Sequence, residues 1–165
     1  MKVTIRKAKK SDATGVGKLL FSFMNIKNAA EGRRLFLNEL TKGNKYLIAS
    51  VGQDLIGLIS YKKHGRPKHG LAELDHIVVL PKWRGQGVAR KLVGVLEKEL
   101  KQEYRRSGAK LRKLFLLTRY NNKLAQTFYK KVGFKVDAAL KHHFYPGQDE
   151  WMFSKFFHKP KARKK

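Results

Sequence analysis

The chain has 165 residues, enough for one domain with a single hydrophobic core. Its 42% hydrophobic and 11% aromatic content is typical of a folded protein and excludes a disordered one. The formal net charge of +26 favours nucleic acid, ribosomes, anionic membrane surfaces and phosphate-bearing cofactors as partners, but a solvated, soluble surface explains it equally well. There is no cysteine, which excludes disulfides, thiolate metal sites and a cysteine nucleophile.

Neither a targeting segment nor a membrane span is expected. The N-terminal residues 1–10 are charged and lack the apolar run of a signal peptide. No stretch approaches the roughly 18–20 apolar residues that a membrane-spanning helix needs. We therefore expect a soluble protein of the cytoplasm.

Hydrophobic periodicity predicts strands alternating with helices along the chain. The first half is predicted to contain a strand at 3–8, helices at 13–25 and 30–40, and a hairpin with strands at 46–51 and 55–61. After a basic loop at 62–70, the predicted elements are strand 71–80, helix 88–107, strand 111–118, helix 123–132 and strands at 134–136 and 150–157. This pattern predicts an α/β or α+β domain built on one sheet over residues 1–157, followed by a basic, disordered tail at 158–165.

The turn between the apolar strand and the long helix carries a candidate anion site. Pro81 ends the strand, Gly85 and Gly87 allow tight backbone turns, and the helix begins at Val88. Backbone N–H groups and the helix dipole form an anion site there that suits a pyrophosphate, although glycines are also common in such turns for steric reasons. The dinucleotide-binding fingerprint and the phosphate-binding P-loop fit worse, because the glycines and partner residues that they need are missing.

Residues 84–89, with the sequence RGQGVA, resemble the Q/R-x-x-G-x-G/A signature of the GNAT superfamily of acyl-CoA-dependent N-acetyltransferases. Residues 74–81 resemble the strand that precedes the signature, and residues 122–134 are similar to the family's N-x-x-A-x-x-F-Y-x-K-x-G-F element. With the opening strand and helix cap, the resemblance covers residues 3–157. It implies a single domain with a mixed, mostly antiparallel central sheet, about four flanking helices, and splayed fourth and fifth strands.

The resemblance implies that acetyl-CoA is the cosubstrate and that a primary amine attacks it directly. Backbone groups of Ile77, Val78 and Val79 are expected to bind the pantetheine arm and the thioester carbonyl, and the Val79 N–H can stabilise the oxyanion. Asn122 is expected to contact the cofactor's arm and Tyr129 to protonate the CoA thiolate, the alternative for Tyr129 being a packed aromatic. The pyrophosphate is expected to be bound by Arg84, Gly85, Gln86, Gly87, Val88 and Ala89, mostly through main-chain N–H groups.

The attacking amine must be neutral, so a protonated substrate needs a base. Glu73 and Asp75 lie two residues apart on a predicted strand, so their side chains share a face. Glu73 also resembles a position where many family members keep a glutamate. Either acid can be the base, bind a cationic substrate, or form salt bridges with lysines. His76 is expected on the opposite face as a packing histidine. No metal site is expected, because the other histidines are interpreted as surface residues: His64, His69, His142 and His143.

The acceptor stays open, because family substrates include protein N-termini, lysine side chains, polyamines, aminoglycosides and small amines. A charge of +26 repels a free polyamine unless Glu73 and Asp75 form an acidic pocket. The basic loop 62–69, the helix end 101–106 and the tail are candidate anchors on nucleic acid or a ribosome. The alternative function is a non-catalytic basic module that binds CoA or nucleic acid in a nucleoprotein assembly. Residues 135–157 have few close matches to any family pattern, although this region usually helps to shape the acceptor site in the family. The oligomeric state cannot be predicted.

Overall fold

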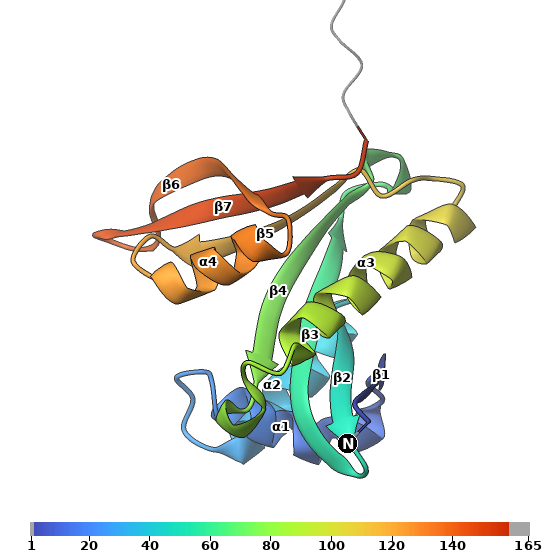
Figure 1. The fold of residues 1–165 in the computed structure, drawn as a ribbon, viewed down its shortest axis with the longest axis vertical. Helices are drawn as coiled ribbons and strands as arrows, with labels where there is room; N and C mark the ends of the chain where they lie inside the picture. The colour runs from blue at the N-terminus through green and yellow to red at the C-terminus, as the bar shows by residue number, and fades with distance from the viewer. Residues whose placement is uncertain (1, 159–165) are drawn as a thin grey trace, which may run out of the picture. The chain divides into compact units, whose positions relative to one another are not determined.

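The computed structural model describes residues 2–158, and its strands form one seven-stranded sheet in the order β1-β2-β3-β4-β5-β7-β6 (Figure 1). The strands are β1 (Thr4–Lys7), β2 (Lys45–Val51), β3 (Asp54–His64), β4 (Leu71–Val79), β5 (Lys113–Arg119), β6 (Lys135–Tyr145) and β7 (Gln148–Phe156). The helices are α1 (Ala13–Phe21), α2 (Ala29–Thr41), α3 (Val88–Arg106) and α4 (Lys123–Lys131). β4 pairs with β5 in parallel, and the pairs β1–β2, β2–β3, β5–β7 and β6–β7 are antiparallel. The predicted α/β class and the mixed, mostly antiparallel sheet are confirmed. Among the described helices, none is long and apolar enough to cross a membrane.

The described chain divides into two compact units, the first comprising residues 2–63 and 74–99 and the second residues 64–73 and 100–158. The ladder between β4 and β5 pairs Leu71–Glu73 with Lys113–Phe115, all of which belong to the second unit. The splaying of the fourth and fifth strands stays a prediction. The boundary between a domain at 1–157 and a tail at 158–165 stays a prediction, and residues 159–165 lie outside the described residues.

In the first unit, α1 and α2 approach each other at two glycines. The apolar stripe of α1 and Phe36 of α2 are buried in one core cluster. A Cβ atom on Gly17 would lie 2.5 Å from the Ala29 carbonyl oxygen and 2.7 Å from the Arg33 nitrogen. A Cβ atom on Gly32 would overlap the carbonyl of Gly17. The two helix backbones can therefore come this close only because both positions lack a side chain.

We expect Gly32→Ala to lower the free energy of unfolding by about 1–3 kcal/mol, because the α1 backbone must move to make room for the methyl group. Gly94→Ala on α3 is the matched control, since no heavy atom lies within 4 Å of its Cβ position. That substitution should keep the stability or raise it by up to about 1 kcal/mol, because alanine favours a helix. Urea denaturation measures both, and an unchanged midpoint for Gly32→Ala would contradict the close approach.

In the second unit, α4 packs on β7 through aromatic rings. The Tyr129 ring centroid lies 6.0 Å from that of Phe134 and 6.1 Å from that of Phe153. β6 continues to Tyr145, well beyond the strand predicted at 134–136. This edge strand escaped prediction because its side chains are almost all exposed and so do not alternate between polar and apolar.

Candidate active site

The loop between β4 and α3 has the backbone of an anion cradle. A short 3-10 turn at Pro81–Trp83 leads into Gly85 and Gly87, whose φ angles of 74° and 79° favour glycine. The loop is held by its own side chains, because Arg84 Nε donates to the Val79 carbonyl at 3.0 Å and Gln86 Nε2 donates to the Lys82 carbonyl at 2.9 Å. These two bonds fix the loop to the end of β4 and to its own first turn.

The first turn of α3 also suits an anion. The first N–H groups of an α-helix have no partner within the helix, and the helix dipole places positive potential there. No acidic residue lies in this turn of α3. Val88 is buried, so its side chain faces the core. The start of α3 thus combines open backbone amides with two left-handed glycines and has no acid in its first turn. This combination suits the binding of a pyrophosphate.

The end of β4 precedes the cradle in the same unit. Val78 is buried in the core cluster, and Ile77 and Val79 are half-buried. On the β3 side, Leu80 N–H donates to the Ile56 carbonyl at 2.9 Å. The Val79 carbonyl accepts a hydrogen bond from Arg84 Nε at 3.0 Å. The role of the 77–79 backbone in binding an extended thioester arm stays a prediction.

Asp75 lies in a cluster of polar side chains within the first unit. Its Oδ2 accepts a hydrogen bond from Asn44 Nδ2 at 3.2 Å and lies 4.0 Å from Lys62 Nζ. His76 Nε2 lies 3.7 Å from Asp75 Oδ2 and 3.7 Å from Glu39 Oε1. The side chains of Glu39, His76 and Asp75 keep 14%, 18% and 22% exposure, so the cluster is partly open to solvent.

Opposite charges shift the proton affinities in this cluster. Burial alone lowers the pKa of His76, but the close contact with Glu39 and the charges of Asp75 and Glu39 outweigh it and raise that pKa. Burial alone raises the pKa of Glu39, but the contact with His76 and a hydrogen bond from the Tyr46 hydroxyl lower it below its ordinary value. Each of the two groups thus favours the charged form of the other.

His76 differs from its expected role as a packing histidine on the face opposite Asp75. Its ring approaches both carboxylates and meets the Phe23 ring edge-on at a centroid distance of 6.5 Å. The physical reason is Glu39, a carboxylate on α2 that draws the imidazole toward it. Sequence reasoning missed Glu39, because an acid on a helix, 37 residues before His76, shows no local link to β4.

Glu73, the other candidate base, has a different environment. It belongs to the second unit, where its Oε2 lies 2.7 Å from His64 Nε2, and the His64 ring packs against Phe115 at 5.4 Å between centroids. Although both acids lie on β4, the structure gives Glu73 a histidine partner and gives Asp75 the larger cluster. The sequence could not distinguish them, because both differences come from other elements.

Asn122 and Tyr129 lie on α4 in the second unit. The Oδ1 atom of Asn122 accepts a hydrogen bond from the Ala125 N–H at 3.2 Å, so this residue caps the helix. Tyr129 is buried, and burial raises its pKa to about 12. No charged neighbour among the described residues contributes to that shift. Both residues thus have a structural role, and the phenol of Tyr129 stays protonated at neutral pH.

One group of described side chains has the spacing of a metal site: the donor atoms of Glu39, Asp75 and His76 lie within 4.8 Å of one another. The Lys62 ammonium lies 4.0 Å from Asp75 and supplies positive charge beside this carboxylate. The expectation of no metal site stays a prediction.

Comparison with known proteins identifies the family. The model of the Acetyltransferase (GNAT) family matches residues 17–134. Comparison with curated proteins gives no match. Similar solved structures include a putative acetyltransferase of the GNAT family from Desulfovibrio desulfuricans, with 25% identity, TM-score 0.74, and coverage of 94% of this chain and 99% of that chain.

Two further structures share the fold at lower identity. Ard1 from Thermoplasma volcanium is 20% identical, with TM-score 0.75 and coverage of 96% of this chain and 100% of that one. Spermidine N-acetyltransferase SpeG from Vibrio cholerae is 20% identical, with TM-score 0.74 and coverage of 93% of both chains. The family match spans well over half of the sequence and includes the glycine cradle. The chain belongs to the GNAT acetyltransferase family.

Proposed function

We propose that the protein transfers the acetyl group of acetyl-CoA to a primary amine of a protein or small molecule by direct attack. The observation that carries this proposal is the cradle at Arg84–Ala89, whose two left-handed glycines open into a helix that has no acid in its first turn. Its open amides suit the pyrophosphate of CoA. Bound acetyl-CoA supplies the activated thioester, and the chain supplies binding groups and proton transfer.

The bond changes assign a role to each candidate residue. The neutral amine nitrogen attacks the thioester carbonyl carbon, and the oxyanion that forms is stabilised by the Val79 N–H. The proton that leaves the amine passes to Asp75 through water. When the carbon–sulfur bond breaks, the thiolate of CoA accepts a hydrogen bond from Tyr129. Asn122 lies at the start of the same helix and is the proposed contact for the arm of the cosubstrate.

Asp75 is the better candidate base because it is nearer to the proposed oxyanion donor along the strand. Four residues separate it from Val79, which is about 13 Å of extended chain, whereas Glu73 is about 20 Å away. Glu73 is also bound to His64 at 2.7 Å. The polar cluster holds Asp75 in place through Asn44 and His76.

Titration calorimetry with acetyl-CoA, and separately with CoA, tests the cradle. We expect micromolar binding of both. Gly87→Val should weaken it about 10-fold or more, because a β-branched residue at a φ of 79° strains the loop. Gly94→Ala, at an exposed position of α3, should bind acetyl-CoA and CoA as the parent does.

The same preparation can be screened for acceptors with a thiol reagent that detects released CoA. The chain has no cysteine, so the protein itself gives no background in this assay. Absence of acetyl-CoA binding at moderate salt would refute the proposal. If Gly87→Val and Gly94→Ala weaken the affinity for acetyl-CoA equally, the cosubstrate binds at a site other than the cradle.

A second candidate function, association with nucleic acid, is favoured by a specific surface. The chain carries a net charge of +26, and the β6–β7 hairpin exposes aromatic rings among basic side chains. This role does not depend on acetyl transfer. It would therefore also apply if the protein were a non-catalytic module that binds nucleic acid.

A location in the cytoplasm stays a prediction.

A further inference from the structure

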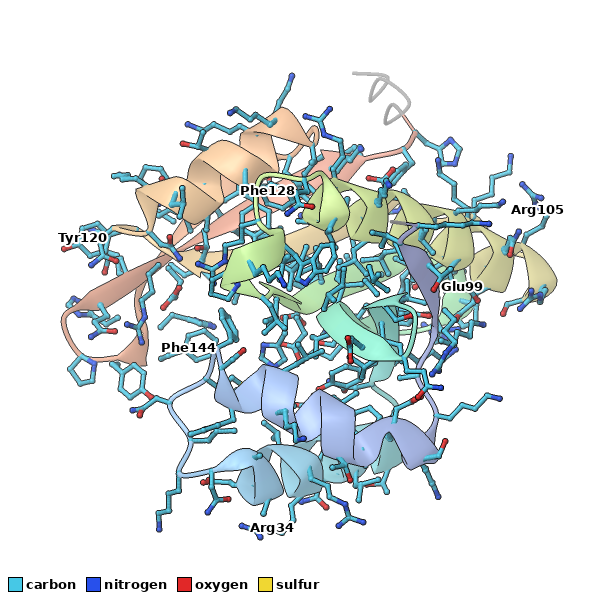
Figure 2. The ribbon with its side chains drawn as sticks, turned by 60° about the horizontal axis from the view of Figure 1, so that its bottom comes forward. Arg34, Glu99, Arg105, Tyr120, Phe128 and Phe144 are labelled. Atoms are coloured by element: carbon cyan, nitrogen blue, oxygen red, sulfur yellow. The ribbon has the colours of Figure 1, made fainter. Side chains whose placement is uncertain are left out.

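Three large aromatic side chains are exposed at the end of the β6–β7 hairpin. Phe144 and Tyr145, at the end of β6, are 62% and 58% exposed, and Tyr120, which follows β5, is 46% exposed. The Tyr120 N–H donates to the Asp149 carbonyl at 3.1 Å, which places Tyr120 against the hairpin end. Figure 2 shows Tyr120 and Phe144 at this end of the hairpin. Aromatic rings so exposed are costly in water unless a partner covers them.

The hairpin end is held in a defined conformation. His142 has a φ of 50°, and its ring Nδ1 accepts a hydrogen bond from the Gly147 N–H at 2.7 Å. The His142 N–H donates to Asp149 Oδ1 at 3.1 Å. These bonds close the turn on itself. The exposed rings therefore project from a fixed scaffold, which reduces the entropy lost when a ligand binds them.

The charges around these rings are positive. The exposed basic residues of this region are Arg119, Lys123, Lys141 and His143. The basic side chains outnumber the neighbouring acids, which are Asp149, whose carboxylate accepts the His142 N–H, and the buried Glu150. The region already pairs cations with rings, since Lys123 Nζ lies 5.1 Å from the centre of the Trp151 ring. The exposed charge thus attracts an anion and repels a basic peptide or a second copy of this chain.

We propose that this surface, consisting of Arg119, Tyr120, Lys141, His143, Phe144 and Tyr145, binds single-stranded nucleic acid. Unpaired bases stack on Phe144, Tyr145 and Tyr120, and the basic side chains contact the phosphates. A duplex offers its phosphates but no free base faces to these rings. The combination of rings and cations therefore favours a single strand over a double one. This binding is independent of acetyl transfer.

Fluorescence anisotropy with a labelled oligouridine of about 12 nucleotides, a length within the usual site sizes, tests the proposal on the full chain. We expect binding that weakens steeply from about 50 to 200 mM salt, and weaker binding of an RNA duplex of the same length. Phe144→Ala and Tyr145→Ala should each weaken binding of the single strand by about 5- to 100-fold without changing the salt dependence. Lys141→Ala should instead reduce the salt slope by about 1.

Two variants separate stacking from other effects. Phe144→Tyr keeps an aromatic face and should restore most of the affinity lost in Phe144→Ala. Phe156→Ala removes a ring that is 54% exposed at the other end of β7 and should leave binding within about 2-fold. The proposal is overturned if Phe144→Ala and Tyr145→Ala bind oligouridine like the parent, or if the duplex binds as tightly as the single strand. Loss of a dimer in Phe144→Ala with unchanged affinity for RNA would assign the surface to self-association and also overturn it.

Discussion

Asp75→Asn lowers kcat/KM for acetyl transfer by about 10²–10³-fold, within the range that a general base contributes. The asparagine keeps the size of the side chain and a hydrogen-bonding oxygen near Asn44, but it cannot accept the proton of the attacking amine. The affinity for acetyl-CoA should stay unchanged, because the cradle at Arg84–Ala89 does not involve this carboxylate. Calorimetry and the thiol-release assay, run on the same preparation, separate the two effects.

Glu73→Gln is the matched control for this substitution. It makes the same chemical change on the same strand, at a carboxylate bound to His64 rather than to the larger cluster. We expect a decrease in kcat/KM of less than about 10-fold. If Glu73→Gln greatly lowers kcat/KM while Asp75→Asn keeps near-parental activity, Glu73 is the base and the assignment to Asp75 is wrong.

The protonation of His76 gives a readout that does not require an acceptor. The charge of Asp75 is one of the causes that raise the pKa of this imidazole. Asp75→Asn should therefore lower the pKa of His76, as followed by nuclear magnetic resonance titration of the imidazole signals. Glu73→Gln should leave it in place, because Glu73 is not among the groups that shift it. Unchanged His76 titration in Asp75→Asn would show that the cluster does not form in solution.

The features that the sequence predicted well are those encoded locally. The cradle needs glycines at Gly85 and Gly87 and a helix that starts at once, and all of these lie within a few residues of one another. Hydrophobic periodicity likewise predicted α3 and α4 to within one residue at their ends. Such features depend on backbone geometry and burial pattern, which a short segment largely determines by itself.

The features that escaped prediction depend on contacts between distant segments. Glu39 and His76 are paired because α2 packs near β4, and neither residue shows this in its own neighbourhood. The choice between Glu73 and Asp75 likewise rests on His64 and Asn44, which belong to other parts of the chain. β6 was predicted too short because an exposed edge strand has little alternation to detect. The partners of these side chains and the full length of β6 are determined by tertiary packing, which local sequence patterns do not reveal.

Tyr129→Phe lowers kcat by about 10- to 100-fold, the low end of what a proton donor contributes. Burial raises the pKa of Tyr129 to about 12, whereas a free thiol has a pKa of about 8.5. Complete transfer of the phenol proton to the CoA thiolate is therefore uphill by about 5 kcal/mol. A buried phenol of this kind stabilises the thiolate mainly by donating a hydrogen bond, and the proton that finally neutralises the sulfur comes from solvent. The affinity for acetyl-CoA should be nearly unchanged.

Tyr104→Phe is the control that separates this chemical role from packing. The Tyr104 hydroxyl is also buried, but it donates to the Leu71 carbonyl at 2.6 Å and therefore has a structural partner. Its removal should cost about 1 kcal/mol of unfolding free energy and leave kcat nearly unchanged. Tyr129→Phe should show the opposite pattern, a loss of kcat with little loss of stability, because its ring still packs against Phe134 and Phe153. If Tyr129→Phe unfolds more easily and keeps its kcat, the residue is a packed aromatic and the thiolate is stabilised by another group.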